Sequence, residues 1–386
     1  MIKKRVAVYR SDLLPISETF IRDQVSALIE WEPVLVGRRE LKDGLKTPNL
    51  QRCVVQESGN RWIRTIRYWL WRPEPCLVRH LRKLGVNLVH AHFGTDATDI
   101  WPSIKAAGLP LLVTLHGYDI NTYHWWWKRG HGGLRRRVYP HRLLKMAQDS
   151  SVRFIAVSNA IKQRAIEYGI PPEKITVCYV GVDTERFKPG GLPLALRPKR
   201  ILFIGRMVEN KAPLQMIRTY AEVCKSVPDA ELVMIGEGPL LAKAKNLANE
   251  LGISIDFLGA RDSDTVLEHL NEARVLCLPS ITLSNGASEA FGLVLLEAQA
   301  CGIPVISSAK GGAYEGLLDG ETGYRFAEGK IDECTKHILS ILTSEENLYQ
   351  KSNKARSFVE KNFDTNHLIK NLERVYSIHF ENSHGK

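Results

Sequence analysis

The sequence lacks long apolar runs, clustered cysteines, internal repeats and low-complexity tracts. No stretch of its 386 residues approaches the ~18–20 apolar residues that cross a bilayer. The apolar stretch Val6 to Tyr9, behind a basic N-terminus, is too short for the core of a signal peptide. We therefore expect neither an exported nor a membrane-spanning protein, and we expect it in the cytoplasm.

The cysteines are scattered, and no two of the seven are spaced as C-x-x-C. This pattern predicts neither a disulfide framework nor a structural zinc site. An H-x-H pair, His90 and His92, follows an apolar run and could hold a metal, but the second half of the chain places no histidine at a strand end. We therefore expect no metal.

Acidic residues are scarce in the first half only. Residues 1–190 carry 31 Lys and Arg against 17 Asp and Glu, whereas the remainder carries 22 against 25. The basic excess predicts a division near residue 190 and an anionic partner for the first half.

What is present is an alternation of short apolar runs with helical patterns. Unbroken apolar runs of this length are typical of strands in a parallel sheet that helices cover on both faces. The expected strands are Arg5–Tyr9, Val34–Gly37, Val86–Ala91, Leu111–Leu115, Arg153–Val157 and Ile175–Cys178, then Arg200–Ile204, Glu231–Ile235, Ser254–Leu258, Val275–Leu278 and Pro304–Ile306. The fold class is therefore α/β, with doubly wound parallel sheets.

A Gly- and Pro-rich segment at 188–198 is the expected linker. It gives an N-terminal Rossmann-like domain over 1–190 and a second one over 198–355. C-terminal helices over 356–386 are expected to pack back on the first domain. Two such domains would face a cleft, with ligands at the carboxyl ends of the strands.

The segment from Ser288 to Ala298 contains two acids around a helix start. Glu289 precedes a helix expected to begin near Phe291, and Glu297 lies about two turns into it. Free N–H groups at that helix end would bind an anion. The alternative is that Glu289 only favours the helix dipole and Glu297 is solvated.

A tight turn after the strand at 200–204 carries Gly205 and Arg206, with Lys211 further on. A guanidinium fork and a lysine beside such a turn suit a diphosphate, and the alternative is ordinary surface charge.

Taken together, these motifs resemble the family-4 retaining glycosyltransferases, which have the GT-B fold. The supporting motifs occur in the family's order: Pro15-x-Ser17-Glu18-Thr19-Phe20, His116-Gly117-x-Asp119, Ser158-Asn159, Gly181-Val182-Asp183, Gly205-Arg206 with Lys211, Gly236-x-Gly238, Phe257-x-Gly259, Glu289 through Glu297, and Gly311-Gly312-x-x-Glu315. The first of these resembles enzymes that build bacterial exopolysaccharide and lipopolysaccharide. Many members carry a Gly-Gly loop after the first strand, but Arg10–Ser17 contains no glycine, so Ser17 or Thr19 would supply contacts there.

The resemblance implies roles for individual residues. Glu289 and His116 are implied as catalytic, and Glu297 as the ligand of the ribose. The implied donor diphosphate site comprises Gly205, Arg206, Lys211, Phe291, Gly292 and Leu293. The implied acceptor side comprises Ser17, Glu18, Thr19, His92 and Asp119. The donor would be a UDP- or GDP-linked hexose, with no cofactor, and no carboxylate nucleophile is implied.

Two basic, aromatic segments remain. Residues 61–72 form an amphipathic pattern, and residues 124–146 hold three tryptophans and seven Lys or Arg without one acid. Each segment either contacts an anionic membrane surface or packs its aromatic face into the first domain.

The sequence therefore predicts a retaining glycosyltransferase that moves a hexose onto a lipid-linked or growing polysaccharide acceptor, peripheral on the inner face of the plasma membrane. The alternatives are a nucleotide-sugar epimerase of the same fold and a polyanion- or nucleic-acid-binding protein. No nucleic-acid recognition motif accompanies the charge, so we expect no nucleic-acid partner.

Overall fold

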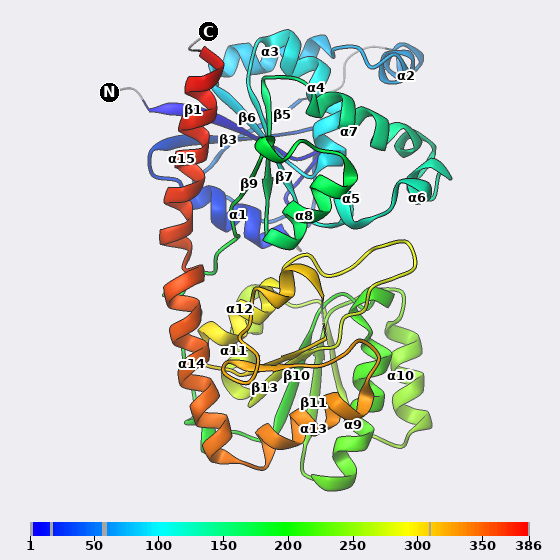
Figure 1. Ribbon diagram of the computed structural model, residues 1–386, viewed down its shortest axis with the longest axis vertical. Coiled ribbons are helices and arrows are strands. Elements are labelled where there is room, and N and C mark those ends of the chain that lie inside the picture. Colours follow the sequence, from blue (N-terminus) through cyan, green and yellow to red (C-terminus); the bar gives the residue numbers. More distant parts are fainter. Residues whose placement is uncertain (1–2, 16–17, 56–59, 309, 385–386) are drawn as a thin grey trace. The chain divides into compact units, whose positions relative to one another are not determined.

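A computed structural model describes residues 3–15, 18–55, 60–308 and 310–384, which form two α/β units (Figure 1). Unit 1 comprises residues 1–180 and 365–386, and unit 2 comprises residues 181–364. Each has a parallel sheet at its centre, as the apolar runs predict.

The sheet of unit 1 has the order β5-β3-β1-β6-β7-β8-β9, and all neighbouring strands pair in parallel. Its strands are β1 (Lys4–Tyr9), β3 (Trp31–Gly37), β5 (Gln51–Val54), β6 (Leu88–His92), β7 (Leu111–Leu115), β8 (Val152–Ala156) and β9 (Ile175–Val177). A separate short pair joins β2 (Asp12–Leu13) to β4 (Arg39–Glu40). The order reverses between β1 and β6, the point where ligands bind in doubly wound sheets.

Helices cover both faces of this sheet. The helices of unit 1 are α1 (Thr19–Ser26), α2 (Arg61–Trp69), α3 (Pro75–Leu84), α4 (Gly94–Ala107), α5 (Tyr118–Asn121), α6 (His124–Lys128), α7 (Tyr139–Ala147), α8 (Asn159–Tyr168) and α15 (Thr365–His384), with 3-10 turns η2 (Leu134–Val138) and η3 (Pro172–Lys174). Apolar residues of α1 and α15 form one core with alternate residues of the strands, while α4 packs on the other face of β6 and β7 with α3 and α7 beside it.

The C-terminal helix α15 is fixed to unit 1 by buried polar contacts. Glu373 Oε1 accepts hydrogen bonds from the N–H groups of Ile29, Glu30 and Trp31, at 2.8, 2.6 and 3.0 Å. The Tyr376 hydroxyl lies 2.7 Å from His90 Nδ1. These bonds make the last helix a part of the first unit, although it is distant in sequence.

Unit 2 has the strand order β12-β11-β10-β13-β14-β15, again all parallel. Its strands are β10 (Arg200–Ile204), β11 (Glu231–Ile235), β12 (Asp256–Gly259), β13 (Val275–Leu278), β14 (Val305–Ser307) and β15 (Gly323–Arg325). Its helices are α9 (Pro213–Ser226), α10 (Leu241–Glu250), α11 (Ser263–Glu272), α12 (Leu293–Ala300), α13 (Ile331–Leu342) and α14 (Glu345–Phe363), with 3-10 turns η4 (Leu194–Leu196), η5 (Glu209–Lys211) and η6 (Gly311–Tyr314). Here the order reverses between β10 and β13.

The division between units differs from the expected boundaries at 190, 198 and 356. Residues 181–198 pack on unit 2, because Arg197 Nη1 donates to the Ala273 carbonyl at 3.2 Å and the Gly190 N–H donates to Asn271 Oδ1 at 2.8 Å. Residues 356–363 belong to α14 and also stay with unit 2. Only the chain from Thr365 onward packs on unit 1.

Candidate active site

The central feature of unit 2 is an ion pair at its switch point. Lys211 lies in η5 after β10, and Glu289 lies in the loop between β13 and α12. Lys211 Nζ donates to Glu289 Oε2, and the two side chains are 20 % and 10 % exposed. The Ile281 N–H donates to the Asn210 carbonyl at 2.8 Å, which ties the two loops together. The structure thus joins two residues that the sequence assigned to separate roles.

Close backbone packing explains the glycines around this pair. A Cβ on Gly236 would lie 2.0 Å from the Gly205 carbonyl oxygen, and one on Gly238 would lie 2.6 Å from that of Met207. The Met207 N–H donates to the Glu237 carbonyl at 2.8 Å. The Gly236-x-Gly238 turn therefore holds the backbone on which Arg206 stands. The Arg206 side chain is exposed and forms no ion pair within the described residues.

The helix α12 begins at Leu293, two residues later than expected. Gly292 has a φ of 75° and caps the helix without a side-chain hydrogen bond. Phe291 is buried and packs on Phe363 with ring centroids 5.5 Å apart. The first N–H groups of an α-helix have no partner within the helix, so the turn at Leu293 can donate to an anion.

Glu297 lies on α12, four residues after Leu293, and is half-buried. Its implied role in binding a ribose stays a prediction.

The switch point of unit 1 carries a cluster of histidines. His92 Nδ1 lies 2.9 Å from His116 Nε2, and Phe20 and Phe93 flank the His116 ring at 5.0 and 4.6 Å. Burial, with a contribution from neighbouring His90, lowers the pKa of both His92 and His116 well below the ordinary value. Both rings are therefore neutral at pH 7. Within the described residues His92 Nε2 is buried without a hydrogen-bond partner.

Asp119 is buried and positions the loop that carries His116. Its carboxylate accepts from the N–H groups of Gly94, Gly117 and His116 at 2.7, 3.0 and 3.1 Å. Burial raises the pKa of Asp119 to about 6, although the backbone N–H groups act to lower it. Because the side chain is inside the unit, its place is behind the loop rather than at a surface for an acceptor.

Arg10 fills the loop after β1 and was not among the residues predicted from the sequence. Its guanidinium bonds Glu18 at 2.8 and 2.5 Å and Asp96 at 2.5 Å, and it covers the Phe93 ring at 4.5 Å. Burial alone would lower the pKa of Arg10, but the two carboxylates raise it above the ordinary value. The sequence signal was a charged residue directly after a buried strand.

Of the remaining acceptor-side predictions, only Glu18 is seen to contact Arg10 within the described residues. Glu18 is its partner, and Thr19 is the first residue of α1. Ser17 lies outside the described residues.

The aromatic face of α2 is exposed and does not pack into the core. Trp62, Ile66 and Trp69 are 75 %, 55 % and 47 % exposed, and Ile63 and Leu70 on the same face are exposed too. The core-packing alternative for residues 61–72 is therefore wrong.

The segment 124–146 divides differently. Trp127 is fully buried against Tyr139, Arg142 is buried and donates to the Tyr68 carbonyl at 2.5 Å, and Arg136 pairs with Asp99 at 3.2 Å. These three stabilise unit 1 itself. Of the tryptophan, lysine and arginine side chains in this segment, the exposed ones are Trp125, Lys128, Arg129, Arg135, Arg137 and Lys145.

Within the described residues, no three His, Cys, Asp or Glu side chains are grouped to hold a metal ion. Nor does this part of the chain contain a helix long and apolar enough to span a membrane.

Comparison with known proteins connects both units to glycosyltransferases. Residues 18–186 match the model of Glycosyltransferase Family 4, and residues 184–358 match that of Glycosyl transferases group 1. The GDP-mannose-dependent alpha-(1-6)-phosphatidylinositol monomannoside mannosyltransferase of Mycolicibacterium smegmatis is 32% identical over 305 residues, which cover 74% of this chain and 77% of that protein. The amylovoran biosynthesis glycosyltransferase AmsK of Erwinia amylovora is 26% identical over 75% of this chain and 69% of its own length.

Among solved structures, Anabaena HepE in complex with UDP and glucose superposes with a TM-score of 0.79 at 17% identity, over 97% of this chain and 100% of that one. Lipopolysaccharide outer core galactosyltransferase WaaB gives a TM-score of 0.67 at 18% identity, over 97% and 99% of the two chains. This likeness shows the fold, two Rossmann-like domains of the GT-B type. With the family matches over nearly the whole chain, the protein belongs to the family-4, group 1 glycosyltransferases and is a transferase.

Proposed function

We propose that the protein transfers a hexose from a UDP- or GDP-linked donor to a lipid-linked or growing polysaccharide acceptor, with retention of configuration, in the synthesis of a cell-surface glycan. The observation that carries this proposal is the Lys211–Glu289 pair beside the open N-terminus of α12. The names of the relatives support a nucleotide-sugar donor and a glycan product.

The donor would lie at the switch point of unit 2. Breaking a sugar–diphosphate bond leaves negative charge on the diphosphate, and Lys211, Arg206 and the first N–H groups of α12 would stabilise it. When the diphosphate takes the ammonium of Lys211, Glu289 is freed to accept from hydroxyls of the sugar. Glu297 would bind the ribose, and no metal is required by this arrangement.

The acceptor would meet His116. A neutral imidazole between two aromatic rings accepts a hydrogen bond from a sugar hydroxyl, and its bond to His92 fixes the ring. Asp119 would act through the loop and not on the acceptor.

Association with the cytoplasmic face of the plasma membrane is a part of the proposal. The exposed apolar face of α2 and the exposed basic side chains of 124–146 support it. The variant that tests it changes Arg129, Arg135 and Arg137 to Glu and leaves Arg136 alone, because Arg136 is paired inside the unit. Loss of sedimentation with anionic vesicles is the expected result, and binding that resists both this change and raised salt would contradict it.

The test of the transfer itself is a thermal-shift panel of nucleoside diphosphates. A ligand at ~100 times its Kd adds ~2.7 kcal/mol of stability, so the cognate base should stand out. The matching nucleotide sugar is then incubated with and without membranes that contain acceptor. Release of nucleotide only with acceptor supports a transferase, whereas conversion of the sugar without acceptor would indicate the epimerase.

A further inference from the structure

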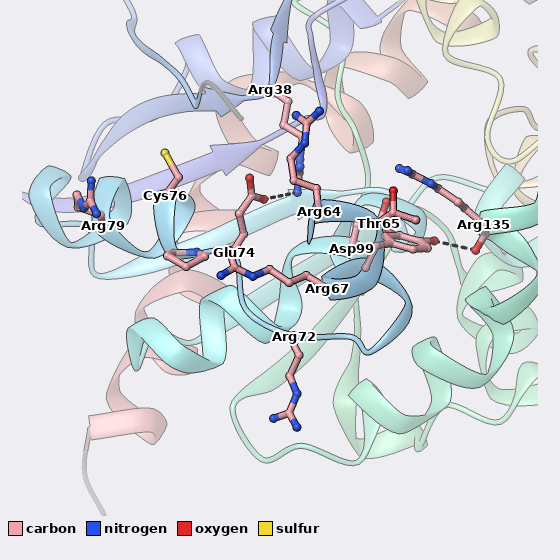
Figure 2. Close-up of a pocket in the computed structure, with 12 residues that line it drawn as sticks. Arg38, Arg64, Thr65, Arg67, Arg72, Glu74, Cys76, Arg79, Asp99 and Arg135 are labelled. Carbon is pink, nitrogen blue, oxygen red and sulfur yellow. Dashed lines mark hydrogen bonds and ion pairs between the residues drawn. The ribbon is translucent and has the colours of Figure 1, made fainter. Parts of the chain in front are cut away.

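Unit 1 contains a second site, a pocket of about 210 Å³ lined largely by arginine (Figure 2). Its lining comes from α2, the turn between α2 and α3, the first half of α3, α4, η2 and the residue after β3. The arginines are Arg38, Arg64, Arg67, Arg72, Arg79 and Arg135, and the acids are Glu74 and Asp99. None of the residues that surround His116 lines this pocket, so the proposed transfer chemistry does not account for it.

The two acids are too few to neutralise the six arginines. Glu74 Oε2 pairs with Arg38 at 2.7 Å, and Asp99 pairs with Arg136, which is not a lining residue. Arg67, Arg72 and Arg79 are exposed and form no ion pair with a carboxylate in the described part of the chain. Six arginines against two acids leave a formal charge of +4 on the lining, more than one carboxylate ligand would balance.

Helix α2 lies between the arginine-lined pocket and an exposed apolar surface. Arg64, Thr65 and Tyr68 on one side of the helix line the pocket, while Trp62 and Ile66 on the other side are exposed. One helix therefore presents guanidinium groups inward and large apolar side chains outward. This is the arrangement of a helix that lies at a lipid–water interface.

The wall formed by α2 is held in place. Its C-terminal carbonyls at Tyr68 and Trp69 accept from Arg142 Nη2 at 2.5 and 3.3 Å. Trp71, just after the helix, donates from Nε1 to the Thr98 carbonyl at 2.7 Å, and its ring packs at a tilt against that of Trp101, with centroids 4.7 Å apart. The pocket is therefore anchored on α4 and α7 at this end of α2.

We infer that this pocket binds the phosphate or diphosphate group of a lipid while the apolar face of α2 enters the bilayer surface. A guanidinium fork matches phosphate oxygens in bidentate geometry, and several of them suit the two or more charges of a monoester or a diphosphate. The inference rests on the proposed function, since a lipid-linked acceptor carries such a group next to its sugar. Free phosphate has the same chemistry, so the test separates the two sources.

The test compares charge reversal inside the pocket with reversal elsewhere. The pocket variant is Arg67→Glu with Arg79→Glu. The control is Arg218→Glu with Lys243→Glu, two exposed cations on α9 and α10 of unit 2. Binding is measured by sedimentation with phosphatidylcholine vesicles containing phosphatidic acid, and by calorimetric titration with inorganic pyrophosphate.

The pocket variant should bind the vesicles at least about 25-fold more weakly than wild type, because each basic side chain near an anionic surface contributes about fivefold. It should also lose pyrophosphate binding, and the control should lose neither. A third variant, Trp62→Ser with Trp69→Ser, identifies the source. It should lose vesicle binding but retain pyrophosphate, whereas vesicle binding that survives this change would point to a soluble phosphate ligand and overturn the lipid assignment.

Two further outcomes would overturn the inference. One is equal vesicle and pyrophosphate binding by the pocket and control variants. The other is loss of RNA binding in the pocket variant with vesicle binding intact. Nucleoside diphosphate binding in unit 2, measured on the same variants, separates the two proposals. If the donor proposal fails, wild type binds no nucleoside diphosphate; if only the pocket inference fails, that binding is intact.

Discussion

The two units share one strand order over six strands, to which unit 1 adds β9, but they differ at the point where the order reverses. In unit 1, Arg10 fills this point, with its guanidinium held between Glu18 and Asp96. In unit 2, the corresponding residue, Gly205, has no side chain and lies in closely packed backbone. The ion pair of Lys211 and Glu289 lies in the loops that follow β10 and β13. In unit 1 a buried side-chain clamp fills the position, whereas in unit 2 closely packed glycine backbone and a single ion pair occupy it. The two units therefore share a topology, and the loop residues decide which side chains stand where the strand order reverses.

The largest expected effect concerns the clamp. Arg10→Ala should lower the stability of unit 1 by about 3–5 kcal/mol, because it removes the guanidinium that both Glu18 and Asp96, two buried carboxylates, contact. All eight tryptophans lie in residues 1–180, so tryptophan fluorescence during urea unfolding reports unit 1 alone. Arg10→Lys, which keeps a charge, is the control and should lose less. A loss of stability below 1 kcal/mol in Arg10→Ala would show that the contacts of Arg10 with Glu18 and Asp96 do not stabilise unit 1.

The second test concerns the ion pair of unit 2. Glu289→Gln should lower turnover by roughly 10²–10³, the usual loss when one electrostatic contact to a transition state is removed. The fold should persist, and nucleoside diphosphate binding should hold or tighten because Lys211 loses its competing carboxylate. The measurements are initial rates, circular dichroism and calorimetry. Turnover within threefold of wild type would show that Glu289 has no catalytic role and only forms the ion pair with Lys211.

The third test uses pH and acts on unit 1. Burial lowers the pKa of His90 to about 3, and those of His92 and His116 well below the ordinary value. Each histidine that is neutral when folded and protonated when unfolded costs ~1.4 kcal/mol per pH unit below ~6.5. The histidines therefore do not reduce the free energy of unfolding of unit 1 above pH ~6.5, and they reduce it progressively as the pH falls below that value.

Asp119 acts in the opposite direction. Its folded pKa of about 6 lies above the ordinary 3.8, so folding takes up a proton between these values and offsets one histidine. The cluster should then cost unit 1 about 2–3 kcal/mol between pH 6 and pH 5. Urea unfolding followed by tryptophan fluorescence at the two pH values measures this, and Asp119→Asn should steepen the loss. A stability independent of pH in this range would mean that the histidines are charged in the folded state.

The fourth test asks whether Arg206 and Lys211 contact the diphosphate or are ordinary surface charges of unit 2. Arg206→Ala and Lys211→Ala should each weaken nucleoside diphosphate binding by about 1.5–3 kcal/mol, the range for a hydrogen bond to a charged group. Binding of the free nucleoside should change little, since neither cation would reach the base. Calorimetric titration with both ligands measures the difference. Equal losses for the two ligands would place these cations away from the phosphates.

The smallest expected effect is that of a chelator. Arg206, Lys211 and the N-terminus of α12 can take the charge of a leaving diphosphate, so turnover should be unchanged by EDTA. The measurement is the initial rate before and after EDTA, with Mg²⁺ and Mn²⁺ added back. Activity lost to EDTA and restored by either ion would add a divalent cation to the donor site.

Much of the fold follows from apolar runs. The bounds expected for β7, β10, β11 and β13 are those of the structure. The strands not expected are β5 and β15 at sheet edges, which are short and carry no unbroken apolar run, and the short pair of β2 and β4. An edge strand is specified by its neighbour's backbone more than by its own side chains.

The site was less predictable than the fold. The glycines and charges after β10 and before α12 carry a local signal, because tight turns and helix starts have preferred residues. For Arg10 the only local signal is a charge directly after a buried strand, and its partners Glu18 and Asp96 are set by how the loops pack. The burial of Trp127 and the exposure of Trp62 could not be told apart from composition, because both lie in short basic segments rich in aromatic residues.

The sequence by itself determined the parallel sheets, their helices and the residue types at the switch point of unit 2, since these depend on periodicity and turn chemistry within a few residues. Only the tertiary structure decided the pairing of Lys211 with Glu289, 78 residues apart, the clamp of Arg10 on Asp96, 86 residues apart, and the seat of α15 on unit 1. It also gathered arginines from the residue after β3, from α2 and the turn that follows it, and from α3 and η2 around one pocket. Such contacts arise from the folded path of the chain, and no local pattern encodes which distant side chains will meet.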